Sequence, residues 1–417
     1  MPNYDLIVIG GGPAGMFAAG FAALSGARVV LLEKNRRVGA KVLITGKGRC
    51  NVTNSEPDVR KFAEQFGANG KQLLTALYAY GVQEVIDFFQ QRGLPLTVER
   101  GGRVFPSHGD ARDVQRLLER FLGESGVEVR CASEVRQLVR CGDQISAVQT
   151  AAGELKGKAV LVATGGLSYP DTGCTGDGYR WARDLGFKVV ATRPALTAID
   201  LHATWTAEVD NFNLKNVELK VVQNGKLLAS RFGEAFFTRD GIGGPIVLDL
   251  SNIVRELLPG GEVVLTLDLK PAVTAELFDK RLQRELADHA NKDFRKSLVN
   301  LLPKAMIPVF VRLSGIAPDK KCHSVTREER QCLLGLFKAL PLQVSGCGGY
   351  DKSIVTRGGI DLRELDMRTL RAKKITNLYF AGEVLDLDGP TGGFNLQVCW
   401  STGYQAGVSA AEAVLSS

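Results

Sequence analysis

Apolar residues at the start of the chain are grouped as in an alternating α/β protein. The run YDLIVI at residues 4–9 is short, apolar and β-branched, which is typical of a strand buried in a parallel sheet. Glycines follow, then a helical stretch to about Ser25, then a second apolar run from Arg28 to Leu32. This order predicts a right-handed β–α–β unit at the N-terminus.

The pattern changes twice further along the chain. The alternation of helix and strand patterns continues beyond the first unit. Helical patterns lie at 71–93 and 110–124, and strand patterns lie at 127–130, 134–139 and 159–163. From about Arg193, alternating runs at 217–222 and 262–269 predict an antiparallel β region, and residues 273–338 are charged and helical. The α/β pattern of the N-terminal part then resumes, with a strand at 378–381 and a final helix from about Asn395.

These changes predict two domains. A discontinuous α/β nucleotide-binding domain would comprise residues 1–190 plus 345–417, and an inserted domain would comprise residues 191–344. We expect the insertion to be β-rich at 191–270 and helical at about 271–338.

Composition excludes several classes of protein. The 417 residues are 45% apolar and 23% charged, as in an ordinary globular protein and unlike a disordered chain. No run of ~20 apolar residues and no signal-peptide pattern is present, so we expect no membrane span. The eight cysteines and four histidines show no metal-ligand spacing, so we expect reduced thiols, no metal site and a cytoplasmic location.

The glycines after the first strand form a dinucleotide fingerprint. In Gly10-x-Gly12-x-x-Gly15, the first glycine permits a tight turn, the second a close approach of pyrophosphate, and the third close packing of helix on strand. The helix N-terminus would bind the phosphates. Glu33 ends the second strand, where its carboxylate can accept hydrogen bonds from ribose hydroxyls.

Two distant segments favour FAD over NAD. Residues 160–166 (VLVATGG) form a strand ending at Ala163, Thr164 and Gly165, and residues 378–383 (LYFAGE) form a strand ending at Gly382 and Glu383. With the fingerprint, they resemble the three signature elements of the glutathione reductase type of FAD fold. No second GxGxxG follows a strand, so we expect NAD(P)H to act only as a transient electron donor.

Two glycine-rich segments are expected beside the flavin ring, because glycine lets the backbone approach a flat ring closely. Residues 45–54 (TGKGRCNVTN) are the first, and Arg49 there can offset negative charge. Residues 389–397 (GPTGGFNLQ) are the second, leading into the final helix. The remaining expected FAD contacts are Lys34, Lys41, Gly48, Cys50, Asn51, Val135, Gly392, Gly393, Phe394, Asn395 and Leu396.

The GKGRCNVTN segment combines with three further motifs, SYPDTGCTGDGY at 168–179, FTRDG at 237–241 and GEVLD…GPTGGFNLQ at 382–397. Together they make the chain similar, over essentially its whole length, to the YhiN-like (BaiN/RdsA) family of FAD-dependent oxidoreductases. The resemblance implies a β-barrel-like insertion with a small helical part, bound FAD and reduction of C=C bonds. It implies a uridine of large-subunit ribosomal RNA or a steroid-type intermediate as substrate; the form of segment 168–179 occurs in only part of the family.

Reduction of a C=C bond needs a proton donor as well as a hydride. Cys50 is one candidate, because a thiol with a pKa near ~8.5 is protonated at pH 7, although Arg49 beside it can lower that pKa. Tyr169 is the competing candidate. Cys174, Cys347 and His108 are further residues to watch.

Positive charge is concentrated in two segments. Residues 33–49 carry six Lys or Arg against one acid, which FAD pyrophosphate partly explains. Residues 279–330 carry twelve against seven, and we expect them either to form a solvated helical face or to contact the backbone of ribosomal RNA. The alternatives are a small-molecule ene-reductase, an amine oxidase, and a flavin-binding redox sensor or RNA-binding scaffold. The oligomeric state stays open.

Overall fold

The computed structural model describes residues 4–416, which fold as two compact units. The first combines Met1–Pro194 with Ser353–Ser417, and the second is Ala195–Lys352. Both breaks lie a few residues beyond the expected limits of 190 and 344. The reason is that β11 (Val189–Ala195) runs past position 190 and pairs with β18 (Val355–Ile360).

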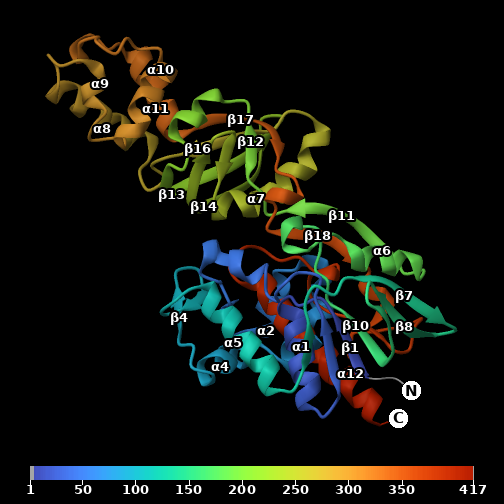
Figure 1. The fold of residues 1–417 in the computed structure, drawn as a ribbon. Helices are drawn as coiled ribbons and strands as arrows, with labels where there is room; N and C mark the ends of the chain where they lie inside the picture. The colour runs from blue at the N-terminus through green and yellow to red at the C-terminus, as the bar shows by residue number, and fades with distance from the viewer. Residues whose placement is uncertain (1–3, 417) are drawn as a thin grey trace. The chain divides into compact units, whose positions relative to one another are not determined.

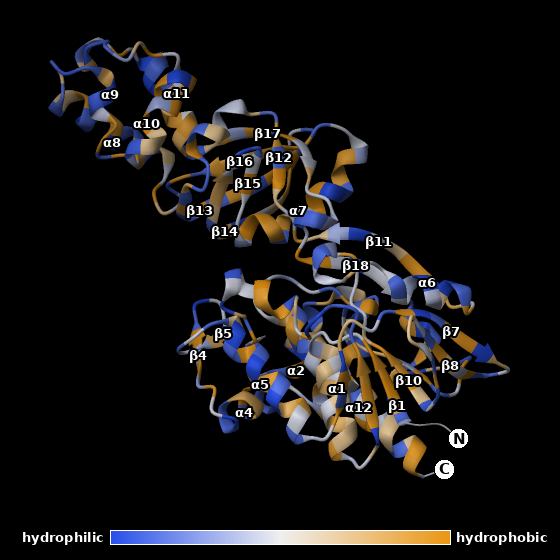
Figure 2. Ribbon diagram, viewed as in Figure 1, coloured by the Kyte–Doolittle hydropathy of each residue, from blue (hydrophilic) through white to orange (hydrophobic). Residues whose placement is uncertain are grey.

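A seven-stranded sheet forms the centre of the first unit (Figure 1). In spatial order its strands are β19 (Leu365–Asp366), β20 (Arg371–Ala372), β21 (Leu378–Phe380), β10 (Gly157–Val162), β1 (Tyr4–Ile9), β2 (Val29–Leu32) and β6 (Glu128–Arg130). The last five are parallel, and β20 is antiparallel to β21. The central strands are apolar along almost their whole length (Figure 2), since both faces of such a sheet are covered.

Two helices far apart in sequence pack together beside the central strands. They are α1 (Pro13–Leu24) and α12 (Phe394–Leu415), and α12 also contacts β1 and β10. A Cβ added at Gly403 would lie 2.4 Å from the carbonyl oxygen of Ala14, and one at Gly407 would lie 2.3 Å from that of Ala18. Glycine at these positions therefore lets the two helices approach closely.

The remaining elements of the first unit flank this sheet. Two three-stranded antiparallel sheets have the spatial orders β3-β5-β4 and β7-β8-β9. Their strands are β3 (Thr53–Asn54), β4 (Leu96–Glu99), β5 (Arg103–Pro106), β7 (Val135–Cys141), β8 (Gln144–Thr150) and β9 (Gly153–Leu155). The helices are α2 (Val59–Glu64), α3 (Gly70–Ala79), α4 (Val82–Gln91), α5 (Ala111–Glu124) and α6 (Asp177–Asp184). The helical pattern at 71–93 is thus divided in two at Gly81, the N-cap of α4.

The second unit contains a closed antiparallel barrel of six strands. Around the barrel these are β12 (Ile199–Leu201), β15 (Gly241–Gly243), β14 (Lys226–Thr238), β13 (Asn213–Gln223), β16 (Val264–Asp268) and β17 (Leu340–Cys347). Helix α7 (Pro245–Leu257) packs on β14. The predicted alternation at 217–222 and 262–269 falls in β13 and β16, with Leu219 and Leu265 fully buried.

Four helices lie between β16 and β17 in the sequence. They are α8 (Ala275–Asp288), α9 (Phe294–Ser297), α10 (Ile307–Ser314) and α11 (Arg327–Lys338), and they gather at one end of the second unit (Figure 1). The rings of Phe278, Phe310 and Phe337 form their core, with Phe337 4.8 and 5.0 Å from the other two ring centroids. The predicted α/β class, with an inserted β-barrel containing a helical part, is confirmed. No helix among residues 4–416 is long and apolar enough to cross a bilayer.

Candidate functional site

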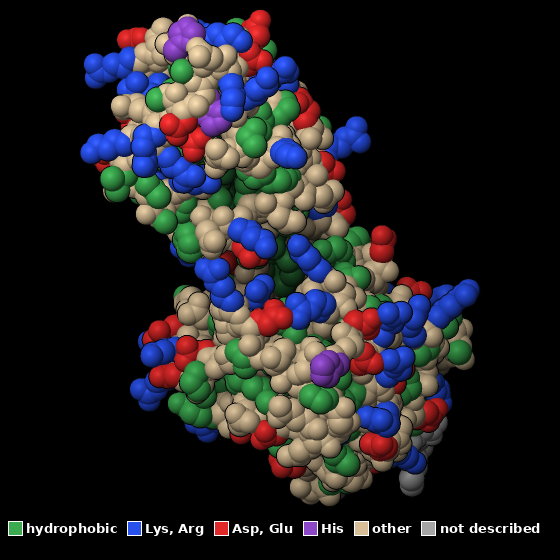
Figure 3. Space-filling view, turned by 90° about the vertical axis from the view of Figure 1, so that its left-hand side faces the viewer, with side chains coloured by type: hydrophobic (Ala, Val, Ile, Leu, Met, Phe, Trp, Pro, Cys, Tyr) green, Lys and Arg blue, Asp and Glu red, His purple; other side chains and the backbone are tan. Residues whose placement is uncertain are grey.

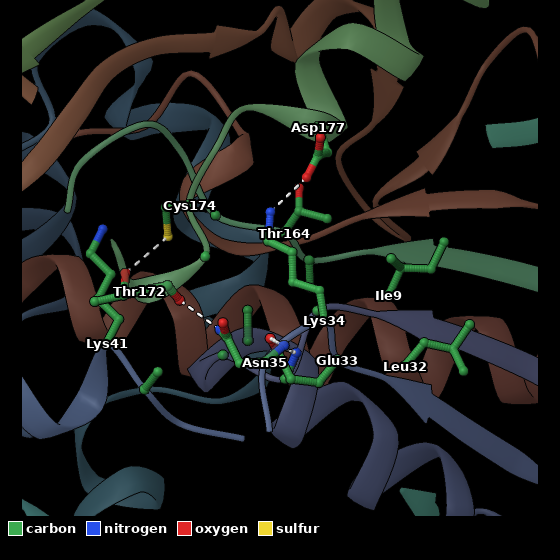
Figure 4. Close-up of a pocket in the computed structure, with 18 of the residues that line it drawn as sticks. Ile9, Leu32, Glu33, Lys34, Asn35, Lys41, Thr164, Thr172, Cys174 and Asp177 are labelled. Carbon is green, nitrogen blue, oxygen red and sulfur yellow. Dashed lines mark hydrogen bonds and ion pairs between the residues drawn. The ribbon is translucent and has the colours of Figure 1, made fainter. Parts of the chain in front are cut away.

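A pocket opens in the first unit at the carboxyl ends of β1, β2 and β10 (Figure 4). Ile9, Leu32 and Ala163 mark these strand ends, and the loop after each contributes further lining residues. The space not filled by atoms is about 790 Å³, including open solvent. In open parallel sheets, ligands bind at this edge.

The three fingerprint glycines have distinct surroundings. Gly10 has φ +106°, and a Cβ there would lie 2.5 Å from the carbonyl oxygen of Ala163. A Cβ at Gly15 would lie 1.8 Å from the carbonyl oxygen of Gly10. A Cβ at Gly12, which lines the pocket, would meet nothing within 4 Å. Gly10 and Gly15 are therefore required by the fold, whereas the bare backbone at Gly12 leaves space for a ligand.

Helix α1 points its N-terminus at the pocket. Its N-cap is Gly12, so no side chain satisfies the first N–H groups, and Pro13 at the first helical position lacks an N–H. Both residues line the pocket, as does Ala14. Uncapped N–H groups and the helix dipole favour an anion at this point.

Glu33 lies at the end of β2 with its carboxylate in the pocket lining. One oxygen, Oε2, accepts a hydrogen bond from the Gly11 N–H at 2.7 Å, and Oε1 accepts one from the Asn35 N–H at 2.8 Å. Each carboxylate oxygen has a further lone pair. The side chain is thus fixed by the backbone and can still accept hydrogen bonds from hydroxyl groups of a ligand.

The segment at 168–179 is held against the loop after β2. Nζ of Lys34 lies 2.8 Å from Oδ2 of Asp177, and Nδ2 of Asn35 donates to the Thr172 carbonyl at 2.9 Å (Figure 4). Thr172, Cys174 and Asp177 all line the pocket. This segment therefore forms one wall of the site. The sequence suggests Tyr169 and Cys174 of this segment for the chemistry, but no residue of it as a cofactor contact.

A mostly buried ion pair joins the loop after β2 to the segment after β21. Nζ of Lys41 lies 2.5 Å from Oε2 of Glu383, and Ser168 hydrogen-bonds both side chains. Burial acts to lower the pKa of Lys41, but the Glu383 carboxylate outweighs it and raises that pKa. The backbone N–H of Thr356 also donates to Glu383. Lys41 therefore stays charged and holds Glu383 in the pocket wall.

One further observation tests whether a dinucleotide fits. Oγ1 of Thr164, a lining residue, is buried and has no hydrogen-bond partner among the described residues. An open backbone at Gly12, an uncapped helix N-terminus, a fixed carboxylate at Glu33 and an unsatisfied hydroxyl match the phosphate and ribose groups of a dinucleotide. The residues present fit such a ligand.

The two other glycine-rich segments pack against each other. Nδ2 of Asn54 donates to the Gly392 carbonyl at 3.0 Å, and Thr53 donates to the buried Gln397 side chain at 2.6 Å. Gly393, with φ +102°, caps α12. The structure thus brings residues 45–54 and 389–397 together, as expected if both face one ligand.

Cys50 and Arg49 lie in the first of these two glycine-rich segments, residues 45–54. The Cys50 side chain is fully buried, and burial raises its pKa to about 12 against the opposing hydrogen bond from Thr45. The Arg49 guanidinium pairs with Glu99 at 2.6 Å and lies 4.2 Å from the centroid of the Phe105 ring. Arg49 is therefore engaged away from the thiol, and the thiol keeps its proton at neutral pH.

The expected cofactor contacts divide between the pocket and the two glycine-rich segments, apart from Gly15 and Gly382, which belong to neither. Ten of them line the pocket: Gly10, Gly12, Glu33, Lys34, Lys41, Val135, Ala163, Thr164, Gly165 and Glu383. Those outside its lining are Gly15, Gly48, Arg49, Cys50, Asn51, Gly382, Gly392, Gly393, Phe394, Asn395 and Leu396. Sequence reasoning missed the lining residues Asn35, Ser133, Glu134, Thr172, Gly173, Asp177, Trp181 and Cys399. Three of these residues, Thr172, Gly173 and Asp177, lie in the SYPDTGCTGDGY motif, which could have indicated them as lining residues.

The other candidates for chemistry are dispersed. Tyr169 is half-buried with φ +52°, and its carbonyl accepts a hydrogen bond from Thr172. Cys174 lines the pocket, and His108 is exposed. Cys347 belongs to the second unit, where burial raises its pKa to about 11. Within residues 4–416, no three His, Cys, Asp or Glu side chains are grouped as a metal site.

Comparison with known proteins identifies the family. The pattern of the HI0933-like protein Rossmann domain matches residues 4–409, and the chain belongs to this family. The match includes both parts of the discontinuous first unit and the inserted second unit. The resemblance found from the sequence motifs is confirmed.

Relatives of known function are similar over their whole length. A "Ribosomal RNA dihydrouridine synthase" of Escherichia coli (strain K12) is 31% identical over 97% of each chain. A "3-dehydro-bile acid delta(4,6)-reductase" of Clostridium scindens is 30% identical over 97% of this chain and 98% of the relative. Both names describe oxidoreductases, and the chain is an enzyme of this class.

Solved structures share the fold at low sequence identity. A flavocytochrome c3 fumarate reductase superimposes with a TM-score of 0.55 and 18% identity, over 99% of this chain and 79% of the other. A 3-ketosteroid-delta4-(5alpha)-dehydrogenase from Rhodococcus jostii RHA1 also gives 0.55, with 15% identity, over 98% and 96%. The Rossmann unit with an insertion is therefore an arrangement found in other redox enzymes.

Proposed function

We propose that this chain is an FAD-dependent oxidoreductase that reduces the C5=C6 bond of a uridine in large-subunit ribosomal RNA to dihydrouridine. The observation that carries the proposal is full-length similarity, at 31% and 29% identity, to two proteins named ribosomal RNA dihydrouridine synthase. The dinucleotide-fitting pocket supports the FAD requirement. A cytoplasmic location, where ribosomal RNA is found, accompanies the proposal.

The residues that would hold FAD are those of the pocket. The N-terminus of α1 at Gly12 would bind the pyrophosphate, and Glu33 would accept hydrogen bonds from a ribose. Val135 would contact the adenosine half, and Glu383, held by Lys41, would contact the polar chain of the cofactor. FAD, reduced by transiently bound NAD(P)H, supplies the hydride for the reduction.

The reduction also needs a donor for the proton that goes to the carbon next to the carbonyl. Two side chains are candidates. The Cys50 thiol stays protonated because burial raises its pKa to about 12. The Tyr169 side chain is half-buried in the segment that also supplies Thr172 to the pocket wall. Substituting each residue in turn shows which of the two donates the proton.

Contact with RNA is proposed for the helical part of the second unit. Lys and Arg side chains are frequent there, among interspersed acids (Figure 3). Several cations of segment 279–330 pair with acids, as in Lys320–Glu329 and Arg330–Asp279. The exposed Lys280, Arg284, Lys292 and Lys304 have no side-chain hydrogen bond or ion pair in the described residues, and such free cations suit RNA phosphates.

Nucleoside mass spectrometry tests the substrate. Ribosomal RNA from cells with the gene disrupted should lack one dihydrouridine, and purified enzyme with FAD and NADPH should restore it on that RNA. An unchanged dihydrouridine content would refute the RNA substrate. NADPH oxidation without any RNA change would remove the scaffold alternative.

A steroid-type substrate is the second candidate. It is favoured by 30% identity to the bile acid reductase over 98% of that protein, nearly the same as to the RNA-modifying relatives. The purified enzyme should then oxidise NADPH with a 3-dehydro-bile acid that carries double bonds at positions 4 and 6, and leave RNA unchanged. An assay with both substrates distinguishes the two functions directly.

A further inference from the structure

The first unit has a second groove that the proposed chemistry does not use. It runs along the β19–β20 hairpin and the residues after it, facing two side chains of α3. About 1060 Å³ of it is free of atoms, including open solvent. Its lining residues are Gln72, Thr75, Leu365, Asp366, Met367, Arg368, Arg371, Ala372, Lys373 and Thr376, none of which lines the dinucleotide pocket.

The groove carries excess positive charge. Arg368, Arg371 and Lys373 are exposed cations in its lining, and Asp366 is its single acid. Within the described chain, neither arginine side chain has a hydrogen bond or ion pair. Among residues 4–416, the one hydrogen bond that Nζ of Lys373 donates goes to the Arg363 carbonyl, at 2.9 Å. Two guanidinium groups are thus available to a ligand.

The hairpin that presents these arginines is held in one conformation. Leu370 has φ +60°, a backbone state rare for a branched side chain, and its side chain is fully buried. Its N–H donates to the Asp366 carbonyl at 2.7 Å. On the α12 side of the hairpin, Nε2 of the buried Gln405 donates to the Met367 and Arg368 carbonyls, at 3.3 and 2.6 Å. A fixed backbone lowers the entropy cost of binding to the two arginines.

The lining indicates the chemical class of the ligand. Guanidinium groups recognise phosphate oxygens in a bidentate manner, and the amide of Gln72 and hydroxyl of Thr75 can add hydrogen bonds. The lining contains no aromatic residue on which a base would stack and no glycine-rich helix N-terminus. These features favour the backbone of a nucleic acid over a free dinucleotide.

We propose that Arg368, Arg371 and Lys373 bind backbone phosphates of the RNA substrate at this groove. The inference rests on the proposed RNA-modifying function and adds a contact in the first unit to the cations of segment 279–330. The contact is to phosphate only, so it strengthens binding without reading the base sequence.

The test compares the holoenzyme with its Arg368→Gln/Arg371→Gln variant. Binding of a transcribed large-subunit ribosomal RNA fragment is measured over a series of salt concentrations. We expect affinity at ~100 mM salt to fall about tenfold or more, and the slope of log affinity against log salt to become shallower by ~1.4 to 1.8 for two lost phosphates. Reduction of bound FAD by NADPH should proceed at the wild-type rate.

The control is Arg136→Gln/Arg183→Gln, which removes the same charge from two exposed arginines of the same unit that line neither pocket. RNA binding equal in the two double variants overturns the proposal. Weaker reduction by NADPH with unchanged RNA binding also overturns it and assigns the groove to the donor's phosphates.

The two hypotheses fail in different ways. If dihydrouridine persists in cells lacking the gene, the proposed function fails whatever the groove binds. If dihydrouridine is lost in those cells but the arginine variant binds RNA as the control does, only the groove assignment fails.

Discussion

Nζ of Lys41 lies 2.5 Å from Oε2 of Glu383, across 342 positions of sequence, with both side chains mostly buried. The pair connects the loop after β2 with the segment after β21, and both residues line the dinucleotide pocket. It therefore joins two parts of the pocket wall that lie far apart in the sequence.

Lys41→Met should therefore destabilise the protein. The substitution leaves the mostly buried Glu383 carboxylate without its cation. Breaking a fully buried pair costs about 3–5 kcal/mol, and we expect a smaller loss here because the pair borders an open pocket. Urea unfolding measures this loss, and FAD absorbance after desalting measures cofactor retention. The double variant Lys41→Met/Glu383→Gln should recover much of the stability, because no uncompensated charge remains. Equal destabilisation by the single and double variants would show that the ion pair is not the cause.

Two fingerprint glycines should respond differently to alanine. At Gly12 an added Cβ meets nothing within 4 Å, so Gly12→Ala should change unfolding free energy by less than about 0.5 kcal/mol and weaken FAD binding at least tenfold. At Gly15 the added Cβ would lie 1.8 Å from a carbonyl oxygen, so Gly15→Ala should destabilise the fold itself. Thermal unfolding of the apoprotein and FAD titration separate these effects. Normal FAD affinity in Gly12→Ala would place the pyrophosphate elsewhere.

Proton transfer should depend on Cys50 or on Tyr169, and the two can be separated. Cys50→Ala removes the thiol, and Tyr169→Phe removes only a hydroxyl. The variant lacking the true acid should lose about 10²- to 10⁴-fold in turnover with substrate while retaining FAD and normal reduction by NADPH. Stopped-flow measurements of FAD reduction by NADPH and of flavin reoxidation by substrate show which of the two steps each variant impairs. Wild-type turnover in both variants would assign the proton to another group or to water.

Alkaline pH should weaken the fold through the buried thiols. The Cys50 pKa is raised from ~8.5 to about 12, so its contribution is complete below pH 8.5 and is lost as pH rises towards 12. Between pH 9 and 10.5, Cys50→Ser should reduce the fall in unfolding free energy by about 1.4 kcal/mol per pH unit. Urea unfolding at several pH values measures the slope. Cys141→Ser, the same substitution at an exposed position, serves as control.

The helical part of the second unit should contribute to RNA affinity. Arg284→Gln/Lys292→Gln removes two exposed cations that have no ion pair in the described structure. RNA binding should weaken several-fold and its salt dependence should become shallower by ~0.7–0.9 for each lost phosphate contact. The Arg136→Gln/Arg183→Gln variant again provides the charge-matched control. Identical salt slopes would leave this surface as a solvated helical face.

Local pattern was sufficient to predict much of the fold. The buried strand at 4–9, the fingerprint glycines and Glu33 are contiguous, and each follows from short-range rules of strand burial and turn geometry. The alternating runs that became β13 and β16 were also readable, because one face of each strand is buried. The division of the helical pattern at 71–93 into two helices at Gly81 could not be predicted, because a glycine inside a helical pattern does not by itself end a helix.

The sequence by itself determined the class of fold and the family, and it predicted a dinucleotide site at the strand ends where the pocket opens, because these depend on glycines, strand ends and motifs that act locally. Only the tertiary structure decided which distant residues meet. It paired Lys41 with Glu383, placed Asn35 against Thr172, and divided most of the expected cofactor contacts between a pocket and the two glycine-rich segments. It also gathered Arg368 and Arg371 with α3 into one groove. Such contacts arise from packing across the sheet, which has no signature in the spacing of residues along the chain.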